Sequence, residues 1–409
     1  MMFSKLGVLG SIMAFGLTTT TPVYAGTAEV IHWWTSGGEA AALKILVDAY
    51  EKTGNTWKDN PVAGGEAARM VARTRILGGD PPTSMQWQVG APLMALAEEG
   101  QLNDIDAVAK DWDKLLPKVI ADNAKFEGKY VSAPIDIHGH NWLWGNQAVL
   151  DDVGIAMPKS WDELIASADK IRAKGYIPLA LGGQSWQEIF VFESILVDVG
   201  GRDFLTKVTY DLDDAALRSP EMLKAFQTFA KVRDLVDPGS PSRDWNITGG
   251  MLISGKAAYM IMGDWLKGEF VAANKVPGKD IACEIFPAGG KTLVFGTDSF
   301  AMTAVKDPAQ REAQLALAKT IMDPVVQKEF SLRKGSIPPR LDVDKTGFDA
   351  CAQIAMGAAA EGQLFLVPDN VADATSIGAL VDQMTTFLHS DMTPEEGMTA
   401  MADAVAATR

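Results

Sequence analysis

Apolar positions along the chain follow two alternating patterns, one typical of strands and one typical of helices. Residues 29–33 predict a first strand. Residues 39–52 predict a helix, because apolar side chains recur every three or four positions until Gly54 ends it. Similar pairs follow through most of the length, without an internal repeat. This alternation predicts an α/β protein with parallel sheets. Such sheets bind ligands at the carboxyl ends of their strands, which directs attention to residues 33–39.

Residues 131–146 form the most informative apparent strand. Its even positions from 136 to 144 carry Asp136, His138, His140, Trp142 and Trp144, whereas positions 135, 137 and 143 are apolar. Successive strand residues point to opposite faces, so one face would pack and the other would be polar and aromatic. We therefore predict a single strand whose second face borders a cleft.

The first 25 residues have the three zones of a secretory signal. Lys5 supplies the positive start, residues 6–17 are mostly apolar, and Ala25 is the small residue that a signal peptidase needs. The apolar run is too short to cross a bilayer, and the cleavage site lacks the cysteine to which a lipid anchor would be attached. We expect a mature chain that begins near Gly26 and resides in a Gram-negative periplasm.

Length and strand pattern together predict two lobes. Removing the signal leaves 409 minus 25, or 384 residues, which exceeds the roughly 250 to 300 residues at which one hydrophobic core stops growing. Residues 295–303 resemble a return strand and residues 336–339 another crossing, so both lobes should be discontinuous. The predicted N-terminal lobe comprises residues 26–136 and 297–340, and the predicted C-terminal lobe comprises residues 137–296 and 341–409.

The charge of the chain argues against two kinds of partner, and its two cysteines leave their redox state open. The net charge of −15, without basic clusters, argues against nucleic acid and against anionic membranes. Cys283 and Cys351 are the only cysteines, and they allow either one disulfide or two buried free thiols.

Tryptophans beside polar residues indicate a sugar site. A pyranose presents patches of C–H bonds that pack on aromatic faces, and hydroxyls that donate and accept hydrogen bonds. The chain has 11 Trp. Each could equally be a packing residue, but two adjacent residues at a strand end point to opposite sides, so one of Trp33 and Trp34 could pack while its neighbour faces the cleft.

Two other chemistries deserve comparison with sugar binding. Asp136, His138 and His140 would put three metal ligands on one face, yet soft fourth ligands are distant, and a polar rim is favoured over a metal. Glu39 and Asp298 could join Asp136 as the carboxylates of a glycosidase, but they serve equally well as acceptors for sugar hydroxyls. We predict no metal, no cofactor and no catalytic residues.

Five motifs spread over the whole mature chain resemble those of the periplasmic sugar-binding proteins of ABC importers. The branch in question includes maltose-binding and glucose-binding proteins, and the motifs are closer to the glucose-binding ones. They are His-Trp-Trp-Thr-Ser-Gly-Gly-Glu at 32–39, the segment 132–146, Met-Gly-Asp-Trp at 262–265, Thr-Asp-Ser at 297–299 and Arg-Lys-Gly-Ser-Ile-Pro-Pro at 333–339.

This resemblance implies the periplasmic-binding-protein fold, with a sugar held between two α/β lobes and closure read by a membrane permease. Trp33 or Trp34, together with Trp265, would stack on the ring. The residues that would bond the hydroxyls are Glu39, Gln86, Gln88, Asp298, Lys334 and His389, and the second-tier candidates are His138, Asn141 and Trp186. Relatives often carry a basic residue where Gln88 stands, which leaves the choice of hexose open.

The sequence thus predicts a monomeric binding protein that delivers a monosaccharide to an ABC permease. D-glucose is the first candidate, with galactose and mannose as near alternatives. A secreted carbohydrate-active hydrolase is the competing class, and an oligosaccharide or polyol is the competing ligand.

Overall fold

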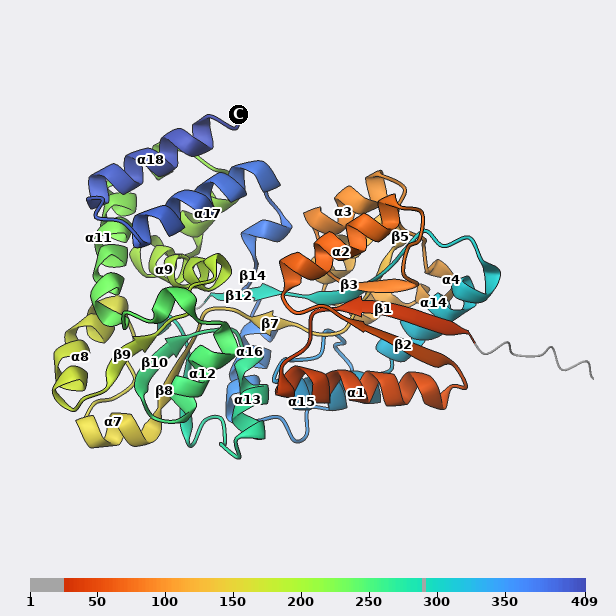
Figure 1. The fold of residues 1–409 in the computed structure, drawn as a ribbon, viewed down its shortest axis with the longest axis horizontal. Coiled ribbons are helices and arrows are strands. Elements are labelled where there is room, and N and C mark those ends of the chain that lie inside the picture. Colours follow the sequence, from red (N-terminus) through yellow and green to blue (C-terminus); the bar gives the residue numbers. More distant parts are fainter. Residues whose placement is uncertain (1–25, 289–291) are drawn as a thin grey trace, which may run out of the picture.

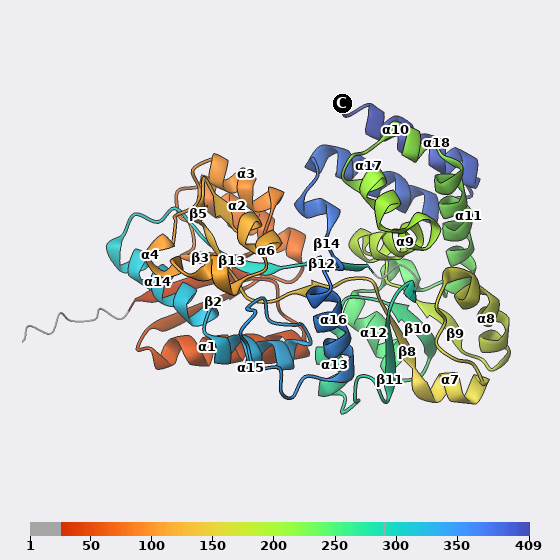
Figure 2. The same ribbon diagram turned by 180° about the vertical axis from the view of Figure 1, so that it is seen from behind.

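The protein consists of two α/β lobes that lie side by side (Figures 1 and 2). The computed structural model describes residues 26–288 and 292–409, so the predicted signal at 1–25 lies outside the described residues. No helix in the described ranges is long and apolar enough to cross a membrane.

The N-terminal lobe is built on a five-stranded sheet of order β2-β1-β3-β13-β6. Strands β1, β2 and β3 are parallel, whereas β13 runs antiparallel to both β3 and β6. The elements of this lobe are β1 (Thr27–His32), α1 (Gly37–Lys52), β2 (Thr56–Pro61), α2 (Gly65–Leu77), β3 (Ser84–Gln88), α3 (Ala91–Glu98), α4 (Asp106–Ala109), α5 (Trp112–Leu115), α6 (Lys118–Asn123), β4 (Lys125–Phe126), β5 (Lys129–Tyr130), β6 (Ser132–Pro134), β13 (Asp298–Met302), α14 (Pro308–Ile321) and α15 (Pro324–Lys334).

The C-terminal lobe has a four-stranded sheet of order β11-β8-β10-β9 and a three-stranded sheet of order β14-β12-β7. Its elements are β7 (His138–Gly139), β8 (Trp142–Asn146), α7 (Gln147–Val153), α8 (Trp161–Ala173), β9 (Ile177–Ala180), α9 (Ser185–Thr209), α10 (Asp214–Leu217), α11 (Pro220–Leu235), η1 (Ser240–Ser242), α12 (Trp245–Ile253), β10 (Ala257–Ile261), α13 (Leu266–Ala272), β11 (Ile281–Ile285), β12 (Leu293–Gly296), α16 (Ala350–Ala360), β14 (Leu364–Leu366), η3 (Pro368–Asn370), α17 (Ala374–Leu388) and α18 (Pro394–Ala406).

Helix α1 illustrates how the sequence specifies a local element. Ser36 caps its start by accepting a hydrogen bond from the Glu39 N–H, and the Glu39 carboxylate accepts one from the Ser36 N–H in return. Leu43, Leu46 and Tyr50 are buried against the sheet, as their spacing predicts. The capping box therefore places Glu39 at the end of β1, where the two lobes meet.

Three segments cross between the lobes. The chain passes from β6 to β7, returns from β12 to β13, and runs alongside the first crossing after α15, where Ile337 pairs with Ile137. The predicted boundaries at 136/137 and 296/297 fall in the first two of these connections.

The prediction of one continuous strand over residues 131–146 is wrong. The segment is divided into β6, β7 and β8, and residues on both of its supposed faces are buried. Trp142 and Trp144 stack on each other with ring centroids 5.4 Å apart, inside an apolar core of the C-terminal lobe rather than on a polar rim. The alternation fails as a guide here because a segment that crosses between two lobes is covered on both sides.

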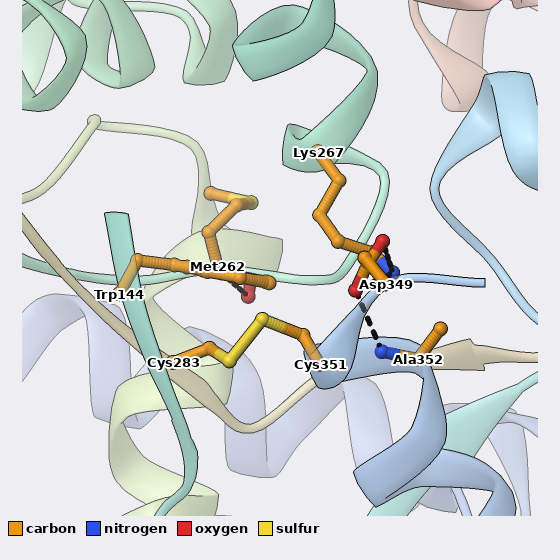
Figure 3. Close-up of a disulfide and its surroundings, with 7 residues drawn as sticks. All are labelled: Trp144, Met262, Lys267, Cys283, Asp349, Cys351 and Ala352. Atoms are coloured by element: carbon orange, nitrogen blue, oxygen red, sulfur yellow. Dashed lines mark hydrogen bonds and ion pairs between the residues drawn. A yellow bond between two sulfur atoms is a disulfide. The ribbon is translucent and has the colours of Figure 1, made fainter. Parts of the chain in front are cut away.

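Cys283 and Cys351 form a disulfide with an S–S distance of 2.08 Å. The bond joins β11 to the first turn of α16 and therefore links the two sequence segments of the C-terminal lobe (Figure 3). Of the two alternatives that the sequence leaves open, the structure selects the disulfide.

Candidate ligand-binding cleft

Lys334, the last residue of α15, lies where the lobes meet. Only 2% of the residue is exposed, and its Nζ is 3.3 Å from Glu39 Oε1. The same Nζ lies 5.6 Å from the ring centroid of Trp34 and 5.9 Å from that of Trp265. A buried ammonium thus faces one indole ring from each lobe, an arrangement that stabilises its charge through the electron-rich ring faces.

Trp33 and Trp34 occupy different environments at the end of β1. Trp34 is 1% exposed and packs on Phe300 and Phe330, with ring centroids 5.7 and 5.1 Å away. Trp33 is half-buried and lies under the Arg69 guanidinium at 5.6 Å. The two residues therefore divide as strand geometry predicts, with Trp34 in the core of its lobe and Trp33 keeping part of its surface exposed.

An aromatic cluster in the C-terminal lobe surrounds Trp265. The rings of His138 and His140 meet Trp265 edge-on, with centroids 5.2 and 5.4 Å away. Trp186 and Phe190 of α9 lie at 6.0 and 5.9 Å. Because these neighbours fix the half-buried indole of Trp265, its orientation is set before any ligand arrives.

His138 is the centre of an ion cluster that spans the crossing strands. Its Nδ1 is 2.5 Å from Asp264 Oδ1, and its Nε2 is 2.8 Å from Asp136 Oδ2 and 3.8 Å from Asp298 Oδ2. Burial alone would lower the pKa of His138, but Asp136 and Asp264 outweigh it and raise the pKa to about 9, against the opposing charge of Lys334. His138 therefore carries a positive charge at neutral pH.

The neighbouring groups titrate at lower pH. Burial, reinforced by Asp136, raises the pKa of Asp298 to about 7, although the charges of His138 and Lys334 oppose this rise. Burial lowers the pKa of His140 to about 3, with a further contribution from the charge on His138. His140 is therefore neutral when His138 is charged.

The protein should lose stability as the pH rises from about 7.5 to about 9, because His138 loses its proton there. The folded-state pKa lies above the ordinary value of 6.5, so its stabilisation is complete below about pH 6.5 and is lost as the pH rises through about 9. Between these two pH values the loss is at most about 2 kcal/mol. Urea unfolding at both pH values should show a smaller loss for His138→Gln than for the wild type.

Trp245→Ala provides the control, because it removes no titratable group. It should lose as much stability between the two pH values as the wild type does. An unchanged pH dependence in His138→Gln would contradict the assignment.

The geometry also bears on the metal hypothesis. Asp136, His138 and Asp298 each offer a ligand atom within 4.8 Å of the others, whereas His140 packs among aromatic rings and does not join them. The charges of His138 and Lys334 offset part of the carboxylate charge of this cluster. The absence of a metal stays a prediction.

Strand β3 carries two of the predicted polar residues. The Oε1 atom of Gln86 accepts a hydrogen bond from the Trp33 N–H at 3.0 Å, and the Gln86 side chain lies close enough to the Asp298 carboxyl to lower the pKa of that group. Gln88 is half-buried and pairs in register with Asp298 of β13. The carboxyl end of β3 therefore presents both amides beside Asp298.

Asn370 is a candidate that the sequence analysis missed. It lies in η3 with 0% exposure, and within the described residues neither its Nδ2 nor its Oδ1 has a hydrogen-bond partner. Its backbone carbonyl contacts Gly90, two residues beyond Gln88. A buried amide without partners is costly unless a ligand satisfies it. No local motif marks Asn370, because only tertiary packing brings η3 to the end of β3.

Two predicted residues lie apart from this group. The Asn141 side chain donates to the carbonyls of Phe286 and Thr292 and accepts from the Val294 N–H, so its hydrogen-bonding capacity serves the backbone. His389 lies at the end of α17, where its Nε2 is 2.6 Å from Glu188 Oε1. It adjoins the aromatic cluster only through α9.

The lobes touch at two places on either side of the crossing strands. At the first, α1 meets α13: the Gly38 N–H donates to Glu269 Oε1 at 3.0 Å, and a Cβ at Gly38 would lie 2.8 Å from the Gly268 carbonyl carbon. At the second, Gly90 meets Asn370. In Figures 1 and 2, α13 lies beside α1 and α15 below these strands, while α3 and the segment between β14 and α17 lie above them. The structure is therefore a closed one.

Comparisons with known proteins agree with this architecture. The family model for bacterial extracellular solute-binding proteins matches residues 34–323. A protein of Rhizobium meliloti (strain 1021) named probable sugar-binding periplasmic protein is 39% identical over 98% of each chain. Two solved structures share the fold at 19% identity. A chitin oligosaccharide binding protein has a TM-score of 0.80, covering 94% of this chain and 98% of its own. The bacterial solute receptor AcbH, described as preferring β-D-galactopyranose, has a TM-score of 0.79, covering 94% and 99%.

Proposed function

Because the chain belongs to the family of bacterial extracellular solute-binding proteins, we propose that it closes around a single hexose and delivers it to the permease of an ABC importer. It is a substrate-binding protein and not an enzyme. The observation that carries the proposal is the set of buried polar groups between the lobes, in which Lys334 lies beside Trp265 and the Asn370 amide has no partner within the described residues.

The chemistry of these groups supports a sugar. Trp265 offers an oriented aromatic face, and sugar hydroxyls both donate and accept hydrogen bonds. The buried Asn370 amide needs such partners, since it has none within the described residues. Asp298, whose pKa is raised to about 7, adds a carboxyl group beside them, and Lys334 adds a charged donor.

The closed geometry supports one ring rather than a chain of rings. The contacts between Gly38 and Gly268 and between Gly90 and Asn370 bring backbone against backbone on both sides of the crossing strands. An oligosaccharide extending past either contact would hold the lobes apart. The fold itself does not decide ligand length, because similar structures bind both kinds of sugar.

Among hexoses, the polar groups should decide which epimer binds. A buried acceptor or donor left without its hydroxyl costs about 1 to 3 kcal/mol. D-glucose is our first candidate, with galactose and mannose next, because the motifs that contain Glu39, Asp298 and Lys334 resemble those of glucose-binding proteins. Gln86 and Gln88 complete the set of proposed polar contacts. Trp33 and Trp186 border this group, while His138 supports it by holding the crossing strands together.

Location follows from the same proposal. The sugar-binding relatives are named as periplasmic, and we propose the periplasm of a Gram-negative cell for this chain, with residues 1–25 as the export signal. Both lobes come from one chain, so we propose a monomer as the binding unit.

Calorimetry on protein refolded to remove any bound sugar tests the proposal. One hexose should bind tightly, while maltose, chitobiose and sorbitol should not. A hexose at 100 times its Kd should stabilise the fold by about 2.7 kcal/mol, which a thermal-shift assay detects. If a disaccharide bound more tightly than every hexose, the ligand would be an oligosaccharide. If no carbohydrate bound, the sugar proposal itself would be wrong.

A further inference from the structure

We propose that the Cys283–Cys351 disulfide positions α13, the helix that follows Trp265, through Asp349 and Lys267. Breaking the disulfide would then weaken ligand binding in addition to destabilising the C-terminal lobe. The inference rests on the proposed function, because it uses Trp265 as a ligand contact.

The disulfide anchors the beginning of α16. Cys351 is the second residue of that helix and is fully buried, whereas residues 344–347 just before the helix are exposed. Phe348, between this exposed run and the helix, packs in the same apolar core as Cys351, so Phe348 and the disulfide together hold the helix start. The bond to Cys283 of β11, an edge strand of the four-stranded sheet, fixes this helix start to the sheet.

Asp349 connects the anchored start of α16 to α13. As the N-cap of α16 it accepts a hydrogen bond from the Ala352 N–H at 2.8 Å. Its Oδ2 is also 3.1 Å from Lys267 Nζ, and both contacts lie within one helical turn of Cys351 (Figure 3). Lys267 is 2% exposed, and within the described part of the chain its carboxylate partner is Asp349. A buried ammonium must stay beside its counter-charge, so Asp349 determines where Lys267 lies.

Lys267 in turn sets the position of the closing surface. It is in the first turn of α13, directly between Trp265 and the residues that touch the N-terminal lobe. Gly268 adjoins the Lys334 carbonyl, and Glu269 accepts the hydrogen bond from Gly38. Because α13 has only seven residues, a shift of Lys267 moves the ring and the interlobe contact together.

Two variants break this series of contacts, from the disulfide through Asp349 to Lys267, at different points. Asp349→Asn removes the counter-charge of Lys267 and keeps an N-cap side chain, while the double variant Cys283→Ala/Cys351→Ala removes the anchor. Calorimetry with the hexose that binds the wild type most tightly should show roughly 2- to 30-fold weaker binding for each, the range in which residues away from a ligand alter coupling. Combined in one chain, the two changes should weaken binding less than the product of their separate effects.

Asp403→Asn provides a matched control in the same lobe. It removes a carboxylate from an ion pair with Arg218, on α18 and away from α13. Its affinity for the hexose should equal that of the wild type, even if its thermal stability is lower.

Reduction of the wild type gives the same test without a substitution. Dithiothreitol would transfer two electrons and two protons to the disulfide, giving two thiols and cyclic oxidised dithiothreitol, and the affinity should fall as in the double variant. Wild-type affinity in the reduced protein, in Asp349→Asn and in the double variant would show that the disulfide stabilises the fold only. Absence of binding by the oxidised wild type would instead contradict the proposed function.

Discussion

Replacing Trp265 with alanine should weaken the binding of every hexose by roughly 100-fold, because central aromatic contacts in closed sites contribute about 2 to 4 kcal/mol. The indole is held by His138, His140 and the aromatic residues of α9, so the ligand does not have to order it. An aromatic face contacts C–H patches that all hexoses possess. The loss should therefore be similar for glucose, galactose and mannose, and calorimetry with each sugar measures it.

Trp245→Ala is the matched control for this prediction. Trp245 is also a half-buried tryptophan of the C-terminal lobe, but it begins α12, and the ring contacts of Trp265 within the described residues are with His138, His140, Trp186 and Phe190. It should lower stability and leave affinity unchanged. A Trp265→Ala variant that bound hexoses as tightly as the wild type would place the ligand elsewhere.

Local periodicity predicts the elements that have one buried and one exposed side. Helix α1, with its capping box and buried face, is an example. The crossing after residue 336 is also foreseeable, since Pro338 and Pro339 interrupt the helical pattern that ends at Lys334. Periodicity fails over residues 131–146 because both sides of that segment are covered.

The candidate site divides in the same way. Glu39, Asp298 and Lys334 stand at or near the ends of regular elements, and Gln86 lies within β3. The resemblance suggests all four as sugar contacts, and the fold brings them to the same interlobe region. Asn370 and the Cys283–Cys351 pairing depend on contacts between distant segments, which no local pattern records. Resemblance alone suggested His389, and the structure instead joins it to Glu188.

The contact between α1 and α13 allows closure to be separated from folding. Gly38 has helical backbone geometry, so no turn requires a glycine at this position. The space that a Cβ would fill is occupied by Gly268 and Glu269 of the other lobe. The neighbouring Gly37 is in the same helical turn, yet a Cβ there would meet no atom within 4 Å. The two glycines are therefore matched in backbone and differ only in their interlobe contact.

Gly38→Ala should consequently weaken hexose binding while leaving the unliganded protein at least as stable. The added methyl would keep α13 from reaching α1 and would break the hydrogen bond from the Gly38 N–H to the Glu269 carboxylate. A hydrogen bond to a charged group is worth about 1.5 to 3 kcal/mol, so affinity should fall about 10- to 150-fold. In the open protein, alanine instead restricts the unfolded chain and stabilises by about 0.4 to 1 kcal/mol.

Gly37→Ala should show the same gain in stability without the loss of affinity, because its methyl lies in open space. Urea unfolding without sugar measures the first effect, and calorimetry measures the second. A destabilised fold would explain weaker binding only if stability and affinity fell together, whereas obstruction of closure predicts that they change in opposite directions in Gly38→Ala. Equal affinities of the two variants would mean that the lobes do not need this contact to hold the ligand.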